Sequence, residues 1–378
     1  MKIVVLGAGR VGSAIVADLA TDRDFVVTAA DTSDEALQRA TSLGAAHVIQ
    51  ADLADASTVG SLAADHDLVV GAVPGPIGYQ TLEAVVQAGT HYVDIAFFEQ
   101  DPFEADGIAK ANGVTALVDC GVAPGLSNLI LGYHSANADS VERFTCYVGG
   151  LPVNRDNVFQ YKAPFSPIDV VAEYTRPARY IEGGQLKEAP ALSHIEQLDF
   201  TDVGTLEAFL TDGLRSLVHT VDVPDMQEKT MRYPGHAQQM ELLREMGLFN
   251  AEPVNVDGVP VSPIQLTTQL LFPMWQFKPG EADLTVMRVE VTATEAGSST
   301  RHRYDLLDYY DAKSDTASMA RTTGYTCTAM VRLVARGEYT KAGVSPPEFV
   351  GRETGCFDAV RKDLEARGIK LVESVEAV

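Results

Sequence analysis

The feature that most constrains the fold is a glycine-rich turn between an apolar run and a helical pattern. Gly7, Gly9 and Gly12 follow the apolar residues 2–6 at the spacing G-x-G-x-x-G. In a strand–turn–helix unit, the first glycine permits a tight turn, the second lets backbone approach a pyrophosphate, and the third lets the helix pack on the strand. The phosphates then meet the positive N-terminus of the helix. The sequence therefore predicts a dinucleotide-binding unit, and a turn that binds nothing is the alternative.

An acidic residue ends the next apolar run and bears on the choice of coenzyme. Residues 25–30 are mostly apolar and lead directly to Asp31. A carboxylate there accepts hydrogen bonds from a ribose 2′-hydroxyl but repels a 2′-phosphate. We therefore expect NAD rather than NADP. The residues expected to contact the coenzyme are those of the turn and of the following strand ends: Gly7, Gly9, Arg10, Val11, Gly12, Asp31, Asp52, Leu53, Ala72, Val73 and Pro74.

The order of apolar and helical segments predicts the fold class. Apolar runs alternate with helical patterns up to residue 118, which is typical of an α/β protein with a Rossmann-type, doubly wound parallel sheet. Later, apolar and polar residues alternate over 287–294 and 303–306 around Gly297, which indicates an antiparallel hairpin. We therefore expect a second, α+β domain with a mixed or antiparallel sheet. The predicted domains are a Rossmann domain at 1–125, a substrate-binding and dimerisation domain at 126–317, and a C-terminal helix and tail at 318–378 that return toward the first domain.

Composition narrows the partners and the compartment. The net charge of −23 disfavours nucleic acid and anionic membranes as partners. No apolar run approaches the ~18 residues of a membrane span, and no basic leader precedes the first strand, so we expect a cytoplasmic protein with a small-molecule substrate. The four cysteines lie far apart without a C-x-x-C pair, which predicts buried free thiols and no metal site. An exposed face of the second sheet predicts a homodimer.

Short motifs spread over almost the whole chain carry a resemblance. They are Val118–Gly125, Tyr147–Pro152, Tyr161–Lys162, Gly204–Phe209, Gly213–Leu217, Lys229–His236 and Ala320–Tyr325. In this order they resemble the saccharopine dehydrogenase and lysine 6-dehydrogenase family. The resemblance implies a dimer and a nicotinamide-dependent oxidation of an amine carbon to an imine that water hydrolyses. One branch of that family cleaves the secondary amine saccharopine, and the other deaminates lysine at its ε-carbon.

The motifs leave more than one function open. Ala123 and Val148 replace an aspartate and a cysteine that saccharopine reductases carry, whereas Arg215 before Ser216 matches those reductases. We expect saccharopine or a related secondary amine as the substrate, with the ε-deamination of lysine as the alternative. A nicotinamide-binding regulatory protein without turnover is the alternative from another class.

The expected reaction needs a proton acceptor. An amine must be neutral before it gives up a hydride, so a base must take its proton. Of the titratable groups at strand ends and in the motifs, His236 needs the smallest pKa change to act near neutral pH. Each candidate also has a structural alternative, such as a buried, hydrogen-bonded histidine. The expected catalytic residues are Asp94, Asp119, Lys162 and His236.

The substrate carboxylates need cationic anchors. A guanidinium group holds a carboxylate through two parallel hydrogen bonds, and three arginines lie in the family-like segments. In so acidic a chain, any of them can instead pair with an aspartate or glutamate. The expected substrate-binding residues are Arg215, Arg232, Arg321 and Thr323.

Overall fold

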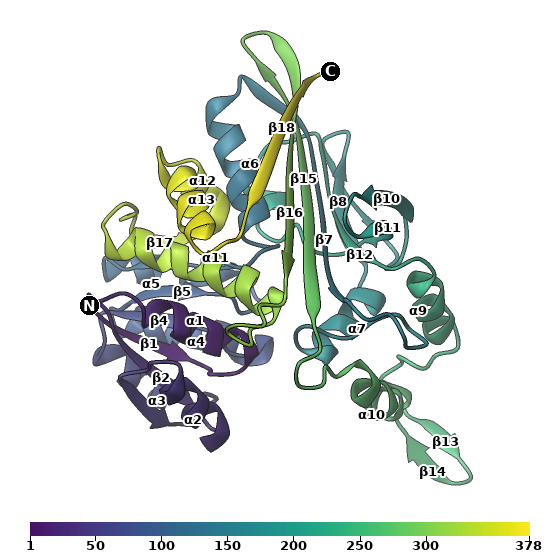
Figure 1. The fold of residues 1–378 in the computed structure, drawn as a ribbon, viewed down its shortest axis with the longest axis horizontal. Coiled ribbons are helices and arrows are strands. Elements are labelled where there is room, and N and C mark those ends of the chain that lie inside the picture. Colours follow the sequence, from purple (N-terminus) through teal and green to yellow (C-terminus); the bar gives the residue numbers. More distant parts are fainter. The chain divides into compact units, whose positions relative to one another are not determined.

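The computed structural model describes all 378 residues and divides into two compact units (Figure 1). The N-terminal unit comprises Met1–Ala138 and Ala320–Leu371, and the second unit comprises Asp139–Met319 and Val372–Val378. Each unit has its own sheet and its own core.

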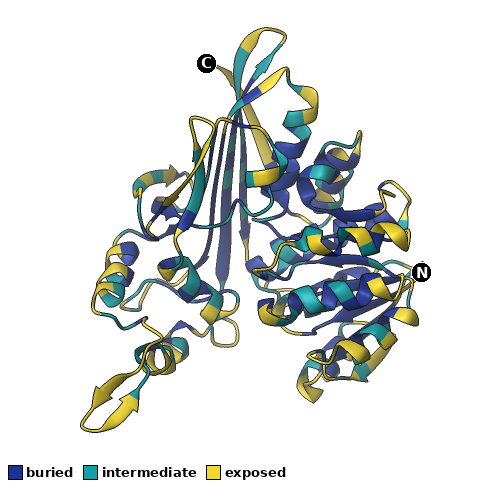
Figure 2. Ribbon diagram, turned by 180° about the vertical axis from the view of Figure 1, so that it is seen from behind, coloured by how far each residue is buried: buried dark blue, intermediate teal, exposed yellow.

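The N-terminal unit contains a seven-stranded parallel sheet, which confirms the predicted Rossmann-type, doubly wound fold. Its strand order is β17-β6-β5-β4-β1-β2-β3, so β1 lies in the interior beside β4 and β2. The interior strands are mostly apolar because helices cover both faces. In Figure 2 they are dark blue, and the residues from Ile3 to Leu6 are fully buried. The strands are β1 Lys2–Leu6, β2 Val26–Asp31, β3 His47–Gln50, β4 Leu68–Gly71, β5 His91–Asp94, β6 Thr115–Leu117 and β17 Gly343–Ser345.

Helices alternate with these strands and then continue from the C-terminal segment. Helix α4 begins at Gly75 after the N-cap residue Pro74, and Pro76 in its first turn has its φ angle preset for a helix. Helix α6, expected at the start of the second domain, belongs to the N-terminal unit, where it packs against α12. The helices are α1 Arg10–Leu19, α2 Asp34–Ser42, α3 Ala56–Ala64, α4 Gly75–Gln87, the 3₁₀ helix η1 Pro102–Ala105, α5 Asp106–Ala111, α6 Leu126–Asn137, α11 Ser318–Ala335, α12 Pro347–Gly351 and α13 Cys356–Ala366.

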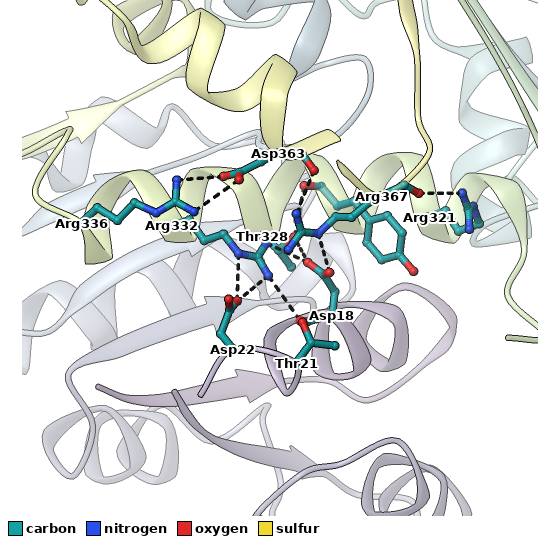
Figure 3. A network of polar contacts seen from close by, with 10 residues as sticks. Asp18, Thr21, Asp22, Arg321, Thr328, Arg332, Arg336, Asp363 and Arg367 are labelled. Carbon is teal, nitrogen blue, oxygen red and sulfur yellow. Dashed lines mark hydrogen bonds and ion pairs between the residues drawn. The ribbon is translucent and has the colours of Figure 1, made fainter. Parts of the chain in front are cut away.

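A buried ionic network joins α1 to the C-terminal part of this unit (Figure 3). The carboxylate of Asp18 is 7% exposed and binds Nη1 of Arg332 at 2.8 Å and the guanidinium group of Arg367. The Arg332 side chain, 2% exposed, also binds Asp22 at 2.6 Å. Nearby, Gly324 of α11 packs on α1: a Cβ added there would lie 3.3 Å from Ile15. These contacts hold α11 and the segment after α13 on the first helix of the chain.

The second unit is built on a nine-stranded mixed sheet, as predicted for its fold class. The main path has the order β10-β11-β12-β7-β15-β16-β18, with β8 pairing with β12 and β9. Only β12 and β7 of this path pair in parallel, and the predicted hairpin is the long antiparallel pair β15–β16. The strands are β7 Ser140–Pro152, β8 Ala178–Glu182, β9 Gln185–Ala189, β10 Glu196–Phe200, β11 Gly204–Leu210, β12 Asp225–Arg232, β15 Asp283–Glu295, β16 Ser298–Tyr309 and β18 Leu371–Ala377.

A helical layer and a small separate hairpin complete this unit. The helices pack around Trp275 and onto Phe209 of β11, which forms a second apolar core. The hairpin of β13 and β14 pairs only with itself and is exposed in Figure 2. The elements are α7 Pro167–Thr175, α8 Leu217–Thr220, α9 His236–Glu245, α10 Pro263–Trp275, β13 Val254–Val256 and β14 Val259–Val261.

Two further properties concern the chain as a whole. All four cysteines are free and buried, as predicted. None of the helices combines the length and the apolar character that crossing a bilayer requires.

Replacing Arg332 by methionine should destabilise the N-terminal unit strongly. The variant leaves the buried Asp18 carboxylate with Arg367 alone and removes the partner of Asp22. Breaking a buried ion pair costs about 3–5 kcal/mol of unfolding free energy. Urea unfolding measures this loss. The matched control is Arg336→Met, because the Arg336 side chain is 46% exposed where it pairs with Asp363. An exposed pair is worth about 1 kcal/mol or less, so equal losses in the two variants would contradict the role given to Arg332.

Candidate functional site

The glycine-rich turn is packed so tightly that two of its glycines have no substitute. Gly7 has φ +94°, and a Cβ added to it would lie 2.4 Å from the carbonyl oxygen of Ala72. A Cβ on Gly12 would lie 1.9 Å from the carbonyl oxygen of Gly7. Backbone hydrogen bonds from Gly7 N to Ala30 O and from Ala72 N to Leu6 O, each 2.8 Å, hold the turn against β2 and β4. These two glycines are therefore required by the packing of the protein itself.

Gly9 differs from them because its missing side chain faces open space. It is the N-cap residue of α1, has φ −66°, and a Cβ on it would meet no protein atom within 4 Å. The first turn of α1 carries no acidic side chain and no side-chain cap, and the first N–H groups of a helix have no partner within the helix. A pyrophosphate group fits this arrangement of open space and positive helix end. The residues present thus suit a dinucleotide.

Asp31 is tied directly to the turn. Its Oδ2 accepts a hydrogen bond from Ala8 N at 2.7 Å and its Oδ1 accepts one from Ser33 N at 2.8 Å. A carboxylate has about four acceptor positions, so each oxygen keeps capacity for a ribose hydroxyl. The negative charge at this position is unfavourable for a phosphate group.

The remaining predicted coenzyme residues lie along the same edge of the sheet. Arg10 is exposed and Val11 half-buried in the first turn of α1. Asp52 is exposed after β3, where it borders an open depression of about 420 Å³ beside α3, and Leu53 is 6% exposed. Ala72, Val73 and Pro74 connect β4 to the N-terminus of α4. The structure therefore brings these residues to the carboxyl ends of β1 to β4, where ligands of parallel sheets bind.

Asp94 and Asp119 form one structural element at the ends of β5 and β6. Asp94 is fully buried, and its Oδ1 accepts a hydrogen bond from Asp119 N at 3.0 Å. Cys120 N donates to the Asp94 carbonyl oxygen at 2.7 Å. Asp119 has φ +57°, a conformation uncommon for a residue other than glycine, and is 4% exposed. The Asp94 side chain thus holds the backbone turn that carries Asp119.

The loop after Asp119 lies against Thr323 of α11, whereas Arg321 of the same helix contacts Arg367. Gly125 has φ +135°, and a Cβ on it would lie 1.8 Å from Gly121 O, so the loop closes on itself before α6. A Cβ on Gly121 would lie 3.4 Å from the Thr323 methyl group. Arg321 donates to the carbonyl oxygen of Arg367 at 3.2 Å.

In the second unit, Arg232 and His236 belong to one buried network. The Arg232 side chain is 2% exposed, binds Glu173 Oε2 at 2.6 Å, and lies 4.5 Å from the centroid of the Tyr161 ring. Its Nε donates to the Tyr174 hydroxyl oxygen at 3.2 Å. That hydroxyl lies 2.9 Å from His236 Nε2, and His236 Nδ1 lies 3.0 Å from the carbonyl oxygen of Phe159.

Burial fixes the protonation of this histidine. Desolvation and the charge of Arg232 lower the pKa of His236 to about 3, so the ring is neutral at physiological pH. A carbonyl oxygen only accepts, so Nδ1 carries the proton toward Phe159 and Nε2 accepts from the Tyr174 hydroxyl group. The ring is therefore a satisfied member of a structural network, the alternative that the sequence left open, and its catalytic role stays a prediction.

Two further predicted residues of the second unit lie elsewhere. Lys162 forms an ion pair with Glu281, and its charge helps to lower the pKa of that carboxyl group. Arg215 is half-buried in the turn before α8 and has φ +53°.

Glu228 is a buried acid that the sequence analysis did not select. It is 6% exposed on β12, and desolvation raises the pKa of its carboxyl group to about 8, against the influence of the Thr211 hydroxyl group and of Arg232. The carboxylates of Glu173 and Asp212 raise the pKa further. A signal was present in the sequence, because Glu228 alternates with Met226 and Thr230 at inward positions of the strand.

Comparison with known proteins identifies the family. Residues 3–117 match the profile described as the saccharopine dehydrogenase NADP binding domain, and residues 121–369 match the saccharopine dehydrogenase C-terminal domain. The chain therefore belongs to the saccharopine dehydrogenase family, as predicted. The first match supports a pyridine nucleotide coenzyme in general and gives no support to the predicted preference for NAD.

Individual relatives are distant. Saccharopine dehydrogenase [NADP(+), L-glutamate-forming] of Saccharomyces cerevisiae is 22% identical over 69% of this chain and 61% of its own. The carboxyaminopropylagmatine dehydrogenase of Synechocystis is 24% identical over 91% of both chains. The chain spans only 29% of alpha-aminoadipic semialdehyde synthase from Mus musculus, at 22% identity. The structure of apo saccharopine dehydrogenase from S. cerevisiae superimposes with a TM-score of 0.81 over both whole chains at 20% identity, which shows a shared fold.

Adding one methyl group at Gly9 should separate coenzyme binding from folding. In Gly9→Ala the methyl group meets no protein atom, so the melting temperature should stay near that of the wild type while the Kd for the coenzyme rises about tenfold or more. The matched Gly12→Ala variant adds the same group against Gly7 O and should lose about 1–3 kcal/mol of stability. Thermal melting and titration of reduced-coenzyme fluorescence measure the two effects. Unchanged coenzyme affinity in Gly9→Ala would contradict the assignment.

Proposed function

We propose that this protein is an NAD-dependent dehydrogenase that oxidises the C–N bond of a secondary amine carrying carboxylates, such as saccharopine. The substrate carbon loses a hydride to the coenzyme, the nitrogen loses a proton, and water hydrolyses the resulting imine to a carbonyl compound and an amine. The observation that carries the proposal is the turn at Gly9, open toward α1 and linked to Asp31, in a chain of the saccharopine dehydrogenase family.

The N-terminal unit would bind the coenzyme and assist proton transfer. The first turn of α1 holds the pyrophosphate, and the Asp31 carboxylate accepts hydrogen bonds from the adenosine ribose. We assign Asp119 as the acceptor of the proton that the substrate nitrogen loses, because Asp94 fixes the Asp119 backbone at the edge of the sheet where ligands bind. In this assignment Asp94 is a positioning residue, since its carboxylate is enclosed.

The second unit would bind substrate carboxylates through Arg215. Among the predicted arginines, Arg232 is enclosed and neutralised by Glu173, so its charge is already compensated. Arg215 is half-buried in a turn and belongs to the arginine–serine pair by which the chain resembles saccharopine reductases. We assign Arg232 to the framework and keep Arg215 as the anchor.

A carboxylated polyamine is a second candidate substrate. The carboxyaminopropylagmatine dehydrogenase of Synechocystis and the carboxynorspermidine synthase of Vibrio alginolyticus each match over 91% of this chain and of their own, whereas the yeast saccharopine dehydrogenase matches over 61% of its length. Such compounds are also secondary amines with a carboxylate, so the reaction class is the same.

A substrate screen tests the proposed reaction. Purified protein with NAD⁺ or NADP⁺ is offered saccharopine, carboxynorspermidine and lysine while the absorbance of the reduced coenzyme is followed. We expect turnover of at least one carboxylated secondary amine and none of lysine, and the Gly9→Ala variant serves as the control with weakened coenzyme binding. Turnover of lysine alone would support the ε-deaminating alternative. Coenzyme binding without any turnover would support the regulatory alternative.

Removal of the Asp31 carboxylate should reduce the preference for NAD. The matching NADP binding domain and the yeast saccharopine dehydrogenase both carry NADP in their names, yet a 2′-phosphate beside Asp31 would meet its negative charge. The ratio of kcat/KM for NAD⁺ to that for NADP⁺ should fall about tenfold or more in Asp31→Ala. The control is Glu35→Ala, which removes the same charge from an 88% exposed side chain. A wild-type preference for NADP⁺ would refute the role of Asp31.

A further inference from the structure

We infer that Glu228 is a positioning residue that acts through Arg215: its buried carboxyl group fixes the backbone turn from Thr211 to Ser216 that presents this arginine. The inference rests on the proposed function, in which Arg215 binds a carboxylate of the substrate. It is carried by the contacts of the carboxyl group with Thr211 and Gly213, two residues of the segment that leads to Arg215.

The first contact joins Glu228 to Thr211. Thr211 N donates to the backbone oxygen of Glu228 at 3.2 Å, which continues the β11–β12 ladder one step beyond Leu210. The Thr211 hydroxyl group donates to Glu228 Oε2 and lies 3.0 Å from the Thr230 hydroxyl oxygen. The residue at which the turn leaves the sheet is therefore bound by both the backbone and the side chain of Glu228.

The second contact places the carboxyl group directly against Gly213. A Cβ on Gly213 would lie 2.3 Å from Glu228 Oε2 and 2.4 Å from its Cδ, and its nearest neighbours are all atoms of this side chain. Gly213 does not have a positive φ angle, so its backbone conformation would accept alanine. A glycine occurs at this position because the Glu228 carboxyl group fills the space that a side chain would need.

Arg215 follows two residues later in an uncommon backbone conformation. Its φ of +53° is unfavourable for a residue with a Cβ and persists only where the neighbouring structure imposes it. Leu214 and Leu217, each 1% exposed, anchor the turn on both sides of Arg215. Asp212 binds Arg179 through both carboxylate oxygens, at 2.8 and 3.1 Å. Glu228 adds a constraint at Thr211 and Gly213.

The charges around Glu228 make glutamine the conservative substitution for it. The guanidinium group of Arg232 pairs with Glu173, and that of Arg179 pairs with Asp212. Neither of these two pairs includes the Glu228 carboxyl group. Burial beside these acids raises the pKa of its carboxyl group to about 8, and the group is mainly neutral at pH 7. Glutamine keeps the shape and the neutral charge, whereas alanine removes the contacts with Thr211 and Gly213.

Steady-state kinetics on a secondary amine that the wild type turns over tests the inference. Arg215→Ala should raise KM about tenfold, the effect of one lost carboxylate contact. Glu228→Ala should raise KM by about three- to tenfold with kcat within about twofold of wild type, and Glu228→Gln should stay near wild type. In the double variant Arg215→Ala/Glu228→Ala, KM should not exceed that of Arg215→Ala, because Glu228 acts through Arg215. Multiplied effects, or an unchanged KM in Glu228→Ala, would overturn the inference.

A methyl group at Gly213 tests the geometry independently. Gly213→Ala alone should lower the melting temperature, because the methyl group meets the Glu228 carboxyl group. In the Glu228→Ala background the same methyl group has room, so the further loss should be small. If the losses in melting temperature of Gly213→Ala and Glu228→Ala simply add in the double variant, the contact between Gly213 and the Glu228 carboxyl group is refuted.

Hydrogen exchange separates failure of the inference from failure of the proposed function. Should the wild type turn over none of the offered amines, the proposed function fails, and the exchange of the Thr211–Ser216 amides decides the role of Glu228. Faster exchange in Glu228→Ala than in wild type and in Glu228→Gln supports the positioning role. Equal exchange in all three proteins would overturn it.

Discussion

The close approach of backbone at the end of β1 is the constraint on which the coenzyme site depends. The turn from Gly7 to Gly12 lies against the Ala72 carbonyl group, and β1 is flanked by β2 and β4 in the middle of the sheet. Because this contact leaves no room for side chains, the first turn of α1 has a fixed position. Ala8 N in the same turn donates to the Asp31 carboxylate, so one piece of backbone links the two groups that we propose for the phosphate and the ribose.

Buried charge pairs fix the framework of both units and limit which residues remain for chemistry. Asp18 binds two arginines in the N-terminal unit, and Arg232 pairs with Glu173 in the second. A buried charge is costly unless a partner compensates it, so these side chains are committed to the fold. In a chain with a net charge of −23, arginines readily find such partners. The presence of an arginine in a motif therefore does not show that it is available to a substrate.

Sequence patterns predicted what depends on local order and missed what depends on distant contacts. The first six strands of the N-terminal unit and the β15–β16 hairpin followed from apolar periodicity. The strand β17 was not predicted, because Val344 stands alone between Gly343 and Ser345 without an apolar run, and only pairing with β6 defines the strand. The enclosure of His236 depends on Tyr174 and Phe159, and the position of Glu228 against Gly213 depends on neighbouring strands, so neither could be inferred from spacing along the chain.

Calorimetric titration of the wild-type protein with NAD⁺ and then with NADP⁺ tests the central claim most directly. Binding at the Gly9 turn beside Asp31 predicts uptake of one coenzyme per chain, with a lower Kd for NAD⁺. Folded protein that takes up neither coenzyme would contradict the account of the site.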